Sequence, residues 1–289
     1  MSRLPPKWSS VHGACTRSGR TVSRAGFLAG NAGLNPAFDP EFLLRVEDAC
    51  LNASAPPQQL WLDGWLVRFS PGKARRARCI QAVAMGRRSV ANKLAQAQVV
   101  YDAAKLPLVV RITPFTQPAV LDADLAAHEF AADDDTRVMV APALDHIAAG
   151  EPLPAGLRWE PIGQAALAQA VGALRGSPLA QRQAHAERLA NSPVPFTALA
   201  IRQDSDGAIV ACGQRAAESG LVGLYDVFVA ESMRGQGLAR TLCARLLADA
   251  REAGSKAAYL QVEADNAPAR AVYVRLGFTD GYGYHYRTR

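Results

Sequence analysis

Residues 226–240 place a strand, a glycine-rich turn and the start of a helix in direct succession. The first four residues favour a strand, and the turn Arg234–Gly237 suits glycine, which adopts backbone conformations that other residues avoid. From Leu238 onward the apolar residues recur at helical spacing. Because the first N–H groups of a helix have no partner inside it, this order predicts a cradle for a phosphate or pyrophosphate. Taken alone, the motif fits an ordinary strand-to-helix turn as well.

The composition indicates a globular protein of one or two domains. The chain has 289 residues, 49% of them hydrophobic, and no apolar run approaches the ~20 residues that a membrane-spanning helix needs. The five cysteines form no C-x-x-C pair, and the five histidines lack metal-ligand spacing. We therefore expect a protein of the reducing cytoplasm, with no membrane partner and no metal.

The positive charge is concentrated at the N-terminus. The formal net charge is +6, and residues 1–38 contain five basic residues and no acid, so residues 39–289 carry only +1. A nearly neutral body argues against a nucleic acid as partner. Residues 1–38 are expected to be a disordered basic tail, and an arginine-rich targeting segment is the alternative.

Residues 39–146 are predicted to form an N-terminal domain, which ends at the loop-forming residues 147–156. Asp39 before Pro40 is a sound helix N-cap, and Asp63-Gly64 between strand-favouring residues is a strong hairpin signal. The predicted elements are helices over 39–52, 94–104 and 119–128, two short strands within 60–70, and strands over 108–113 and 137–140.

Residues 68–88 hold seven basic side chains and no acid. One interpretation is a surface that contacts an acidic substrate or a phosphate. The other is a solvated loop and strand edge, since charge on an edge strand prevents unwanted pairing. The seven residues are Arg68, Lys73, Arg75, Arg76, Arg78, Arg87 and Arg88.

Residues 157–289 alternate strands and helices and end with a well-marked helix. Asn266 caps that helix, Pro268 lies in its first turn, and Gly277 follows its end. The predicted strands cover 157–160, 196–203, 208–216, 222–229, 258–263 and the residues from 278 onward, and the predicted helices cover 164–174, 179–189, 238–253 and 266–276.

Two linked motifs in this C-terminal part resemble those of the GCN5-related N-acetyltransferase family. Residues 234–239 match its R/Q-x-x-G-x-G/A motif, and residues 266–278 match its N-x-x-A-x-x-x-Y-x-x-x-G-F motif, in the family's order. The whole chain resembles uncharacterised bacterial members with an added N-terminal domain, through Trp61–Trp65 and the arginines that follow. The resemblance implies an α/β (α+β) fold, the acyl-CoA N-acyltransferase fold with a mixed central sheet.

The resemblance also implies that acetyl-CoA binds where the strands 222–229 and 258–263 splay apart. Backbone groups of Phe228 and Val229 would pair with the pantetheine arm like an added strand, and Asn266 would bond the amide region of the cofactor. The backbone N–H groups expected to hold the pyrophosphate belong to Arg234, Gly235, Gln236, Gly237, Leu238 and Ala239.

The same resemblance makes Tyr273 the general acid that protonates the leaving thiolate, and a phenol with a pKa of ~10 suits that task. The base stays open. Asp226 and Glu263, on the two splayed strands, are candidates, and each also fits a structural or exposed carboxylate. Deprotonation through water is a further alternative. His285 is placed either at the acceptor pocket or in a structural role.

An offset of 148 residues relates the two halves of the chain, so residues 39–146 are predicted to be a degenerate copy of the same fold. The copy lacks the chemistry: Gly237 aligns with Ser89, Tyr273 with Leu125, and Asn266 with Pro118. We therefore expect that it does not bind acetyl-CoA and that it shapes the acceptor pocket or packs as a scaffold.

These features predict an enzyme that acetylates a primary amine of a small molecule by direct attack on acetyl-CoA. One alternative is a non-catalytic acyl-CoA-binding regulatory module. The other is a transferase for a macromolecule, such as a protein N-terminus or aminoacyl-tRNA, with Arg68–Arg88 as the docking surface. The fold does not name the acceptor.

Overall fold

The computed structural model describes residues 33–148 and 150–289, which belong to one compact unit. The predicted disordered tail therefore lies largely outside the described residues. Its last residues contact the body: Leu34 forms a β-bridge with Tyr282, and the N–H of Asn35 donates to the carbonyl of Gly281 at 2.8 Å.

The first part of the chain, which the structure describes over residues 33–148, contains three α-helices, one short 3-10 helix and five strands in that range, and it begins with a capped helix. The carboxylate of Asp39 accepts from the N–H of Glu41 at 3.0 Å, as the N-cap pattern predicts. The elements are α2 (Pro40–Ala53), β1 (Gln59–Leu62), β2 (Trp65–Arg68), the short 3-10 helix η1 (Arg75–Ala77), β3 (Ile80–Ala82), α3 (Val90–Ala104), β4 (Val109–Ile112), α4 (Leu121–Ala127) and β5 (Ala131–Ala141). Asp63-Gly64 forms the turn between β1 and β2 as predicted, whereas β3 was not predicted and β5 begins well before residue 137.

The second part of the chain, residues 150–289, follows the predicted order of elements closely. Its elements are β6 (Leu157–Ile162), α5 (Gln164–Leu174), α6 (Leu179–Ala190), β7 (Phe196–Gln203), β8 (Ile209–Glu218), β9 (Leu221–Val229), η2 (Glu231–Met233), α7 (Leu238–Glu252), β10 (Ala257–Glu263), α8 (Ala267–Arg275) and β11 (Thr279–Thr288). Pro161 is accommodated because β6 is an edge strand, where a missing N–H costs no ladder bond.

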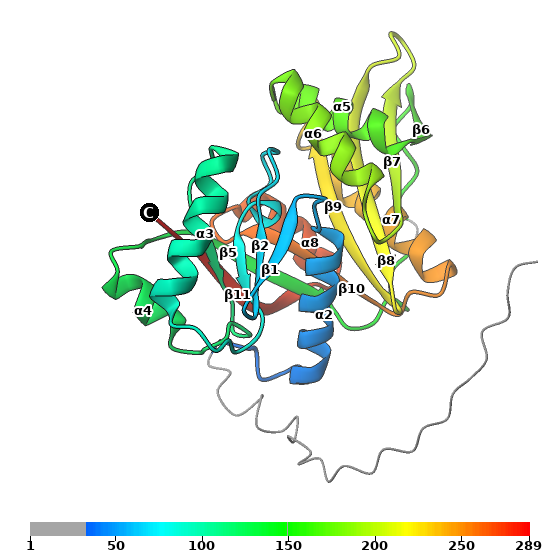
Figure 1. Ribbon diagram of the computed structural model, residues 1–289. Helices are drawn as coiled ribbons and strands as arrows, with labels where there is room; N and C mark the ends of the chain where they lie inside the picture. The colour runs from blue at the N-terminus through cyan, green and yellow to red at the C-terminus, as the bar shows by residue number, and fades with distance from the viewer. Residues whose placement is uncertain (1–32, 149) are drawn as a thin grey trace, which may run out of the picture. The chain divides into compact units, whose positions relative to one another are not determined.

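The eleven strands of the described residues form one mixed sheet in the order β1-β2-β3-β4-β11-β5-β10-β9-β8-β7-β6. Figure 1 shows β6, β7 and β8 toward one side of the molecule and α3 and α4 toward the other. Two neighbouring pairs, β3 with β4 and β9 with β10, run parallel, and the other pairs are antiparallel. The predicted fold class, a mixed central sheet with helices, is confirmed.

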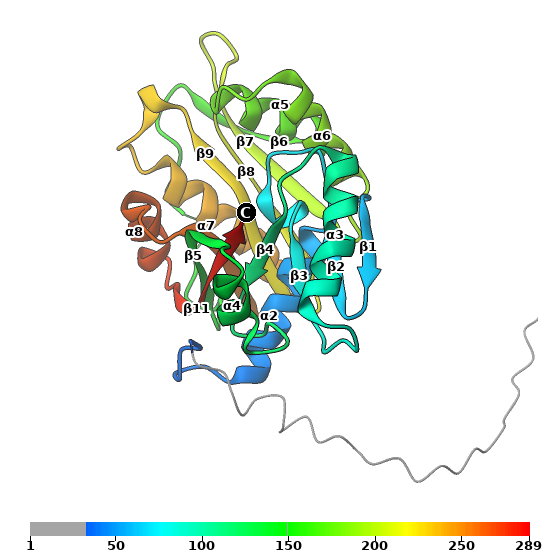
Figure 2. The ribbon, with the colours of Figure 1, turned by 60° about the vertical axis from the view of Figure 1, so that its left-hand side comes forward.

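The two parts of the chain exchange their last strands. β5 of the first part lies between β10 and β11 of the second, and β11 lies between β4 and β5 of the first. The chain therefore ends in the middle of the sheet (Figure 2). The pairing of β5 with β11 is symmetric under the 148-residue offset, which relates residue 131 to residue 279 and residue 140 to residue 288. Thr279 pairs with Val140, and Thr288 pairs with Ala131.

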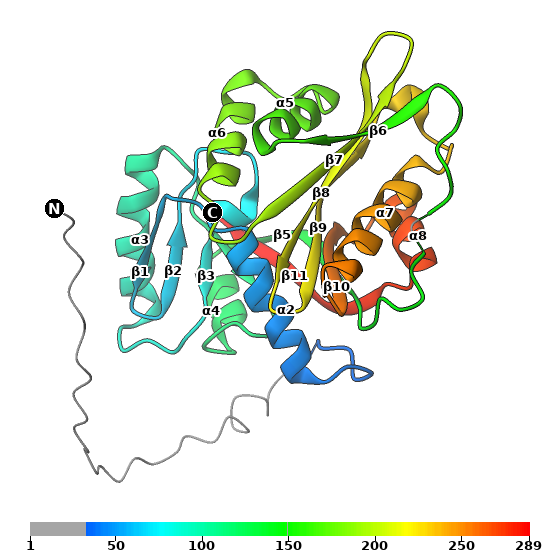
Figure 3. The same ribbon diagram turned by 90° about the vertical axis from the view of Figure 1, so that its right-hand side faces the viewer.

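The helices repeat in the same way. The bounds of α3 and α7 differ by 148 at both ends, and each helix follows the first strand of a parallel pair. Figure 3 shows α3 and α4 beside the strands of the first part, and α7 and α8 beside those of the second.

The core lies on both faces of β5. Val138 and Val140 pack with residues of α2, whereas the alternating Met139 and Ala141 pack with residues of α7. On the α2 side, Arg111 of β4 forms a buried bidentate ion pair with Glu47, whose Oε2 also accepts from the hydroxyl of Tyr282 at 2.6 Å. This network joins α2 to strands of both parts.

Candidate active site

Strands β9 and β10 pair over four residues and then separate. Their ladder ends at Leu224 and Leu260, although both strands continue. Asp226, two residues after Leu224, has φ 52° and lies at a β-bulge in the pairing of β9 with β8. A bulge bends its strand, so the ends of β9 and β10 diverge. Phe228 and Val229 pair with β8 on one side only, which leaves their other edge open for an extended ligand.

The turn after β9 has the geometry of an anion cradle. Gly235 and Gly237 have φ of 79° and 77°, and Gly237 is the N-cap of α7 without any side-chain cap bond. Within the described residues, no backbone N–H from Gly235 to Ala239 has an acceptor, whereas the N–H of Arg234, which was also predicted to hold the pyrophosphate, donates to the carbonyl of Glu231 at 3.3 Å. A Cβ on either glycine would meet nothing within 4 Å, so the space above the turn is open. Free N–H groups at the positive end of a helix hold a phosphate well.

Helix α8 brings Asn266 and Tyr273 to the cleft. The Oδ1 of Asn266 caps α8 by accepting from the N–H of Ala269 at 3.2 Å, which leaves its amide NH2 available. The ring of Tyr273 packs edge-on against Phe278, and its hydroxyl has no hydrogen-bond partner among the described residues. Burial raises the pKa of Tyr273, and the neighbouring Cys243 adds to the effect, so the phenol is protonated at neutral pH.

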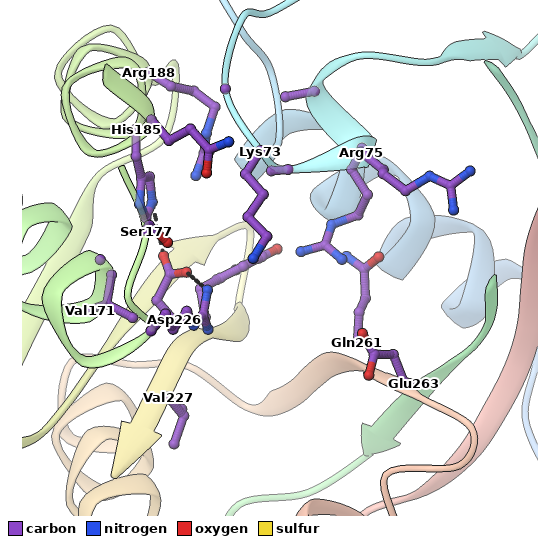
Figure 4. A pocket seen from close by; sticks show the side chains of 18 of the residues that line it. Lys73, Arg75, Val171, Ser177, His185, Arg188, Asp226, Val227, Gln261 and Glu263 are labelled. Carbon is purple, nitrogen blue, oxygen red and sulfur yellow. Dashed lines mark ion pairs between the residues drawn. The ribbon is translucent and has the colours of Figure 1, made fainter. Parts of the chain in front are cut away.

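A pocket of 470 Å³ adjoins the splayed strands. Asp226, Glu263, Asn266 and Tyr273 line it from the second part, together with α5 and α6. Residues 70–77 line it from the first part, and Figure 4 shows Lys73 extending from that loop into the space between Asp226 and Arg75. Four residues that the sequence predicted for the site, either as members or as candidate bases, therefore line one pocket, and the first part of the chain forms another wall of it.

The carboxylate of Asp226 is fully engaged. It lies 3.1 Å from Nε2 of His185 (Figure 4). It also accepts from Nε2 of Gln214 at 2.7 Å and lies 3.6 Å from Nη1 of Arg175. Burial acts to raise the pKa of Asp226, but the hydrogen bond from His185 and the charges of His185, Arg175 and Arg188 outweigh burial and hold the pKa well below its usual value. A carboxylate stabilised in this way is a weak base.

His185 was not predicted as a site residue, because the five histidines lack metal-ligand spacing. It lies on α6 and lines the pocket, and within the described residues its Nδ1 has no partner. A signal was available: Arg182, His185 and Arg188 recur every third residue and so share one face of a helix that has few apolar residues.

The other two candidates differ in place. Glu263 lines the pocket as an exposed side chain. His285 does not line it, and its Nε2 instead lies 2.9 Å from Oδ1 of Asp122, which also accepts from Arg287 at 2.8 Å. The structural interpretation of His285 fits this geometry.

In the first part of the chain, the backbone N–H groups of the corresponding turn bind a carboxylate of the protein itself. The carboxylate of Asp63 accepts from the N–H groups of Arg87 and Arg88 at 2.7 to 3.0 Å, and these bonds lower the pKa of Asp63. Ser89 caps α3 by accepting from the N–H of Asn92 at 3.3 Å. A protein carboxylate and a serine thus take the N–H groups whose counterparts in the second part are free.

The basic run 68–88 does not form one surface. Arg68 is buried and donates to the carbonyl of Leu51 at 2.9 Å, Arg75 lies 2.7 Å from Asp133, and Arg76 lines the pocket. Lys73, Arg75 and Arg76 all line the pocket, so for this portion of the run the geometry agrees with contact to an acidic substrate or a phosphate, and docking of a macromolecule stays a prediction.

No group of three or more His, Cys, Asp or Glu side chains in 33–148 and 150–289 is arranged to hold a metal ion. Over the same residues, no helix combines the length and the apolar character that crossing a membrane requires.

The chain is similar to solved acetyltransferase structures. A GCN5-related N-acetyltransferase from Kribbella flavida superposes with a TM-score of 0.60 at 19% identity, covering 84% of this chain and 94% of that one. A tandem GNAT protein from the clavulanic acid biosynthesis pathway gives 0.57 at 18% identity, covering 70% and 71%. A GCN5-related N-acetyltransferase from Sphaerobacter thermophilus gives 0.55 at 18%, covering 69% and 67%. At these identities the likeness shows the fold.

The comparison with curated proteins gives no match. The family model described as "Probable histone acetyltransferase Rv0428c C-terminal" matches residues 43–287, and this range includes the strand exchange, the cradle and the pocket. The chain therefore belongs to that family, an acyltransferase family with the GCN5-related N-acetyltransferase fold.

Proposed function

We propose that the protein transfers the acetyl group of acetyl-CoA to a primary amine, by direct attack of the amine nitrogen on the thioester carbonyl. Three features carry the proposal: the edge of β9 that stays open where it separates from β10, the free N–H groups of residues 235–239 in the turn that follows β9, and the unbonded hydroxyl of Tyr273, which lines the pocket beside the splayed strands.

The residues present fit acetyl-CoA. The free N–H groups before α7 would hold its pyrophosphate, the open edge at Phe228 and Val229 would pair with the pantetheine amides, and Asn266 would bond the same arm. Bound in this way, acetyl-CoA supplies an acetyl group activated as a thioester.

Tyr273 would act as the general acid. As the new carbon–nitrogen bond forms and the carbon–sulfur bond breaks, the phenol donates its proton to the leaving sulfur. Its lack of a hydrogen-bond acceptor leaves the proton free for this transfer, and burial keeps the phenol protonated until the thiolate develops.

His185 with Asp226 would take the proton from the amine. With Nε2–H donating to Asp226, the lone pair of Nδ1 is the proton acceptor, and the carboxylate stabilises the imidazolium that forms. Asp226, which the sequence offered as the base itself, then acts by holding His185.

The test combines acetyl-CoA calorimetry with an amine-library screen that detects the released thiol. Tyr273→Phe is expected to lower kcat by about 10²–10⁴-fold while the Kd for acetyl-CoA is unchanged. Tyr101→Phe, which removes a hydroxyl bonded to the Arg68 carbonyl in the first part, serves as the control and should keep its kcat.

Two other outcomes are informative. Unchanged turnover in Tyr273→Phe would assign the acid to another group. Acetyl-CoA binding without thiol release for any small amine would favour the two alternatives, a regulatory acyl-CoA-binding module or a macromolecular acceptor.

A further inference from the structure

We infer that Arg76 and Arg188 form an anion site on the acceptor side of the pocket, so that the acceptor is an amine that also carries a carboxylate or a phosphate. The inference rests on the proposed acetyl transfer for its role, but the anion site stands on the geometry of the pocket itself.

The pocket wall carries twice as many basic as acidic side chains. Two of the acidic side chains already interact with basic neighbours, since Asp226 lies beside His185 and Arg175, and Asp134 lies 3.3 Å from Arg75. The basic residues of the wall are Lys73, Arg75, Arg76, Arg175, Arg182 and Arg188, and the acidic ones are Asp134, Asp226 and Glu263. A concave site with a surplus of one sign concentrates ligands of the opposite sign.

Arg76 enters the pocket from η1 of the first part. Its one hydrogen bond within the described residues goes from Nη1 to the hydroxyl of Tyr284 at 3.4 Å, and no carboxylate pairs with it. Its Nε is buried and has no hydrogen-bond partner. Withdrawing a guanidinium from water without a counter-ion is costly, and a bound anion would remove that cost.

Arg188 enters from α6 of the second part. Its Nη1 donates to the carbonyl of Ala53 at 3.2 Å, and within the described residues it also has no carboxylate partner. Burial lowers the pKa of Arg188, Asp226 acts against this, and the charge of Arg76 lowers the pKa further. Two guanidiniums, one from each part of the chain, therefore line the same pocket, and within the described residues neither forms an ion pair with a carboxylate, an arrangement suited to carboxylate or phosphate oxygens.

The place of these arginines assigns the anion to the acceptor. The proposed cradle for the phosphates of acetyl-CoA, residues 235–239, is not part of the pocket wall, whereas His185 and Asp226 are. The charge of Arg188 is one of the causes that lower the pKa of Asp226. An acceptor held at its anionic end by Arg76 and Arg188 would have its amine near His185. A strongly basic peptide would meet like charge in this pocket.

The first experiment measures anion binding without turnover. Inorganic phosphate and sodium acetate are titrated at constant ionic strength, with CoA present, while Tm is recorded for the full chain. The wild type should be stabilised by these anions over chloride, and Arg76→Gln and Arg188→Gln should lose that response. Arg251→Gln is the matched control, because Arg251 is half-buried outside the pocket and also donates to a backbone carbonyl, that of Ile147 at 2.7 Å.

The second experiment uses matched acceptors in the thiol-release assay. Amino acids are compared with their amides, and O-phosphoethanolamine with ethanolamine, which separates carboxylate from phosphate as the recognised group. The anionic member should have at least tenfold higher kcat/KM, and both arginine variants should raise its KM at least tenfold without changing the KM for acetyl-CoA. A basic lysine peptide is the counter-example.

The outcomes separate the two proposals. Arginine-dependent anion binding without transfer to any amine supports the anion site and overturns the proposed transfer. Transfer that prefers neutral amines or the lysine peptide, or that is equal in wild type and both arginine variants, overturns the anion site and leaves the transfer standing. Equal stabilisation by phosphate in all four proteins also overturns the anion site.

Discussion

The contact between Asp226 and His185 assigns each residue a role that the sequence alone did not predict. From the sequence, Asp226 was a carboxylate on a splayed strand and His185 one scattered histidine. In the structure the left-handed backbone of Asp226, at φ 52°, and its bulge aim the carboxylate at the α6 face that carries His185. The carboxylate thereby becomes a fixed partner for the imidazole.

If the pair acts as a unit, removing either member should cost as much as removing both. His185→Gln and Asp226→Asn are each expected to lower kcat by about 10²–10⁴-fold, and the double variant should lose little more. Acetyl-CoA affinity, measured by calorimetry, should be unchanged in all three. Losses that multiply in the double variant would show that the two residues act independently.

The pH dependence of stability gives a second readout for Asp226. Since the folded protein lowers the pKa of Asp226, the ionised carboxylate stabilises the fold at every pH above its unfolded value of ~3.9, and this contribution is lost as the pH falls below that value toward the folded pKa. In urea unfolding, Asp226→Asn should be less stable than the wild type at pH 7, and the difference should shrink below about pH 4. A difference that is constant down to pH 2.5 would contradict the lowered pKa.

At the scale of elements, the role of the turn between β9 and α7 in binding acetyl-CoA can be tested separately from its effect on stability. Gly237→Ala forces a methyl-bearing residue into φ 77°, which costs about 1–2 kcal/mol, and places the methyl in the open space above the free N–H groups. Gly207→Ala is a matched control, with φ 72° and equally open space, in the β7–β8 hairpin. Both variants should lose similar stability, and calorimetry should show weaker acetyl-CoA binding in Gly237→Ala alone.

The corresponding turn of the first part of the chain, at residues 86–89, is expected to bind no acetyl-CoA. Asp63 already satisfies the N–H groups of Arg87 and Arg88, and the Cβ of any residue at 86 would lie 2.3 Å from the Asp63 carbonyl oxygen. Calorimetry on the full chain should therefore give one acetyl-CoA per chain. A stoichiometry of two would show that the repeated turn kept its ligand.

Most elements follow from local sequence signals. The Asp39 cap, the Asp63-Gly64 turn and the apolar spacing from Leu238 each predicted a boundary that the structure confirms within a residue or two. One strand and the first half of another were not predicted, because β3 is three residues long beside a basic run, and the first half of β5 contains three consecutive aspartates. Their pairing with neighbouring strands, and not their own propensity, makes them strands.

At the scale of the whole molecule, the 148-residue repeat predicted a second copy of the fold but not how the copies join. The order β4-β11-β5-β10 depends on pairing between residues more than a hundred positions apart, for which a single sequence carries no local signal. The pocket depends on that joining as well, since Arg76 and Arg188 come from different parts of the chain. A site of this kind is visible only after the fold is known.

The strand exchange predicts that neither part folds alone. Without β5, the isolated residues 150–289 would lack the strand that joins β10 to β11, and the buried face that Met139 and Ala141 give to α7 would be empty. An edge of unpaired backbone beside an apolar gap favours aggregation or an unfolded chain. The fragments 33–148 and 150–289 should each lack cooperative thermal unfolding by circular dichroism and should regain it, with acetyl-CoA binding, when they are co-expressed. The full chain cleaved between them serves as the control, and a fragment 150–289 that unfolded cooperatively by itself and bound acetyl-CoA would show that the exchanged strand is dispensable.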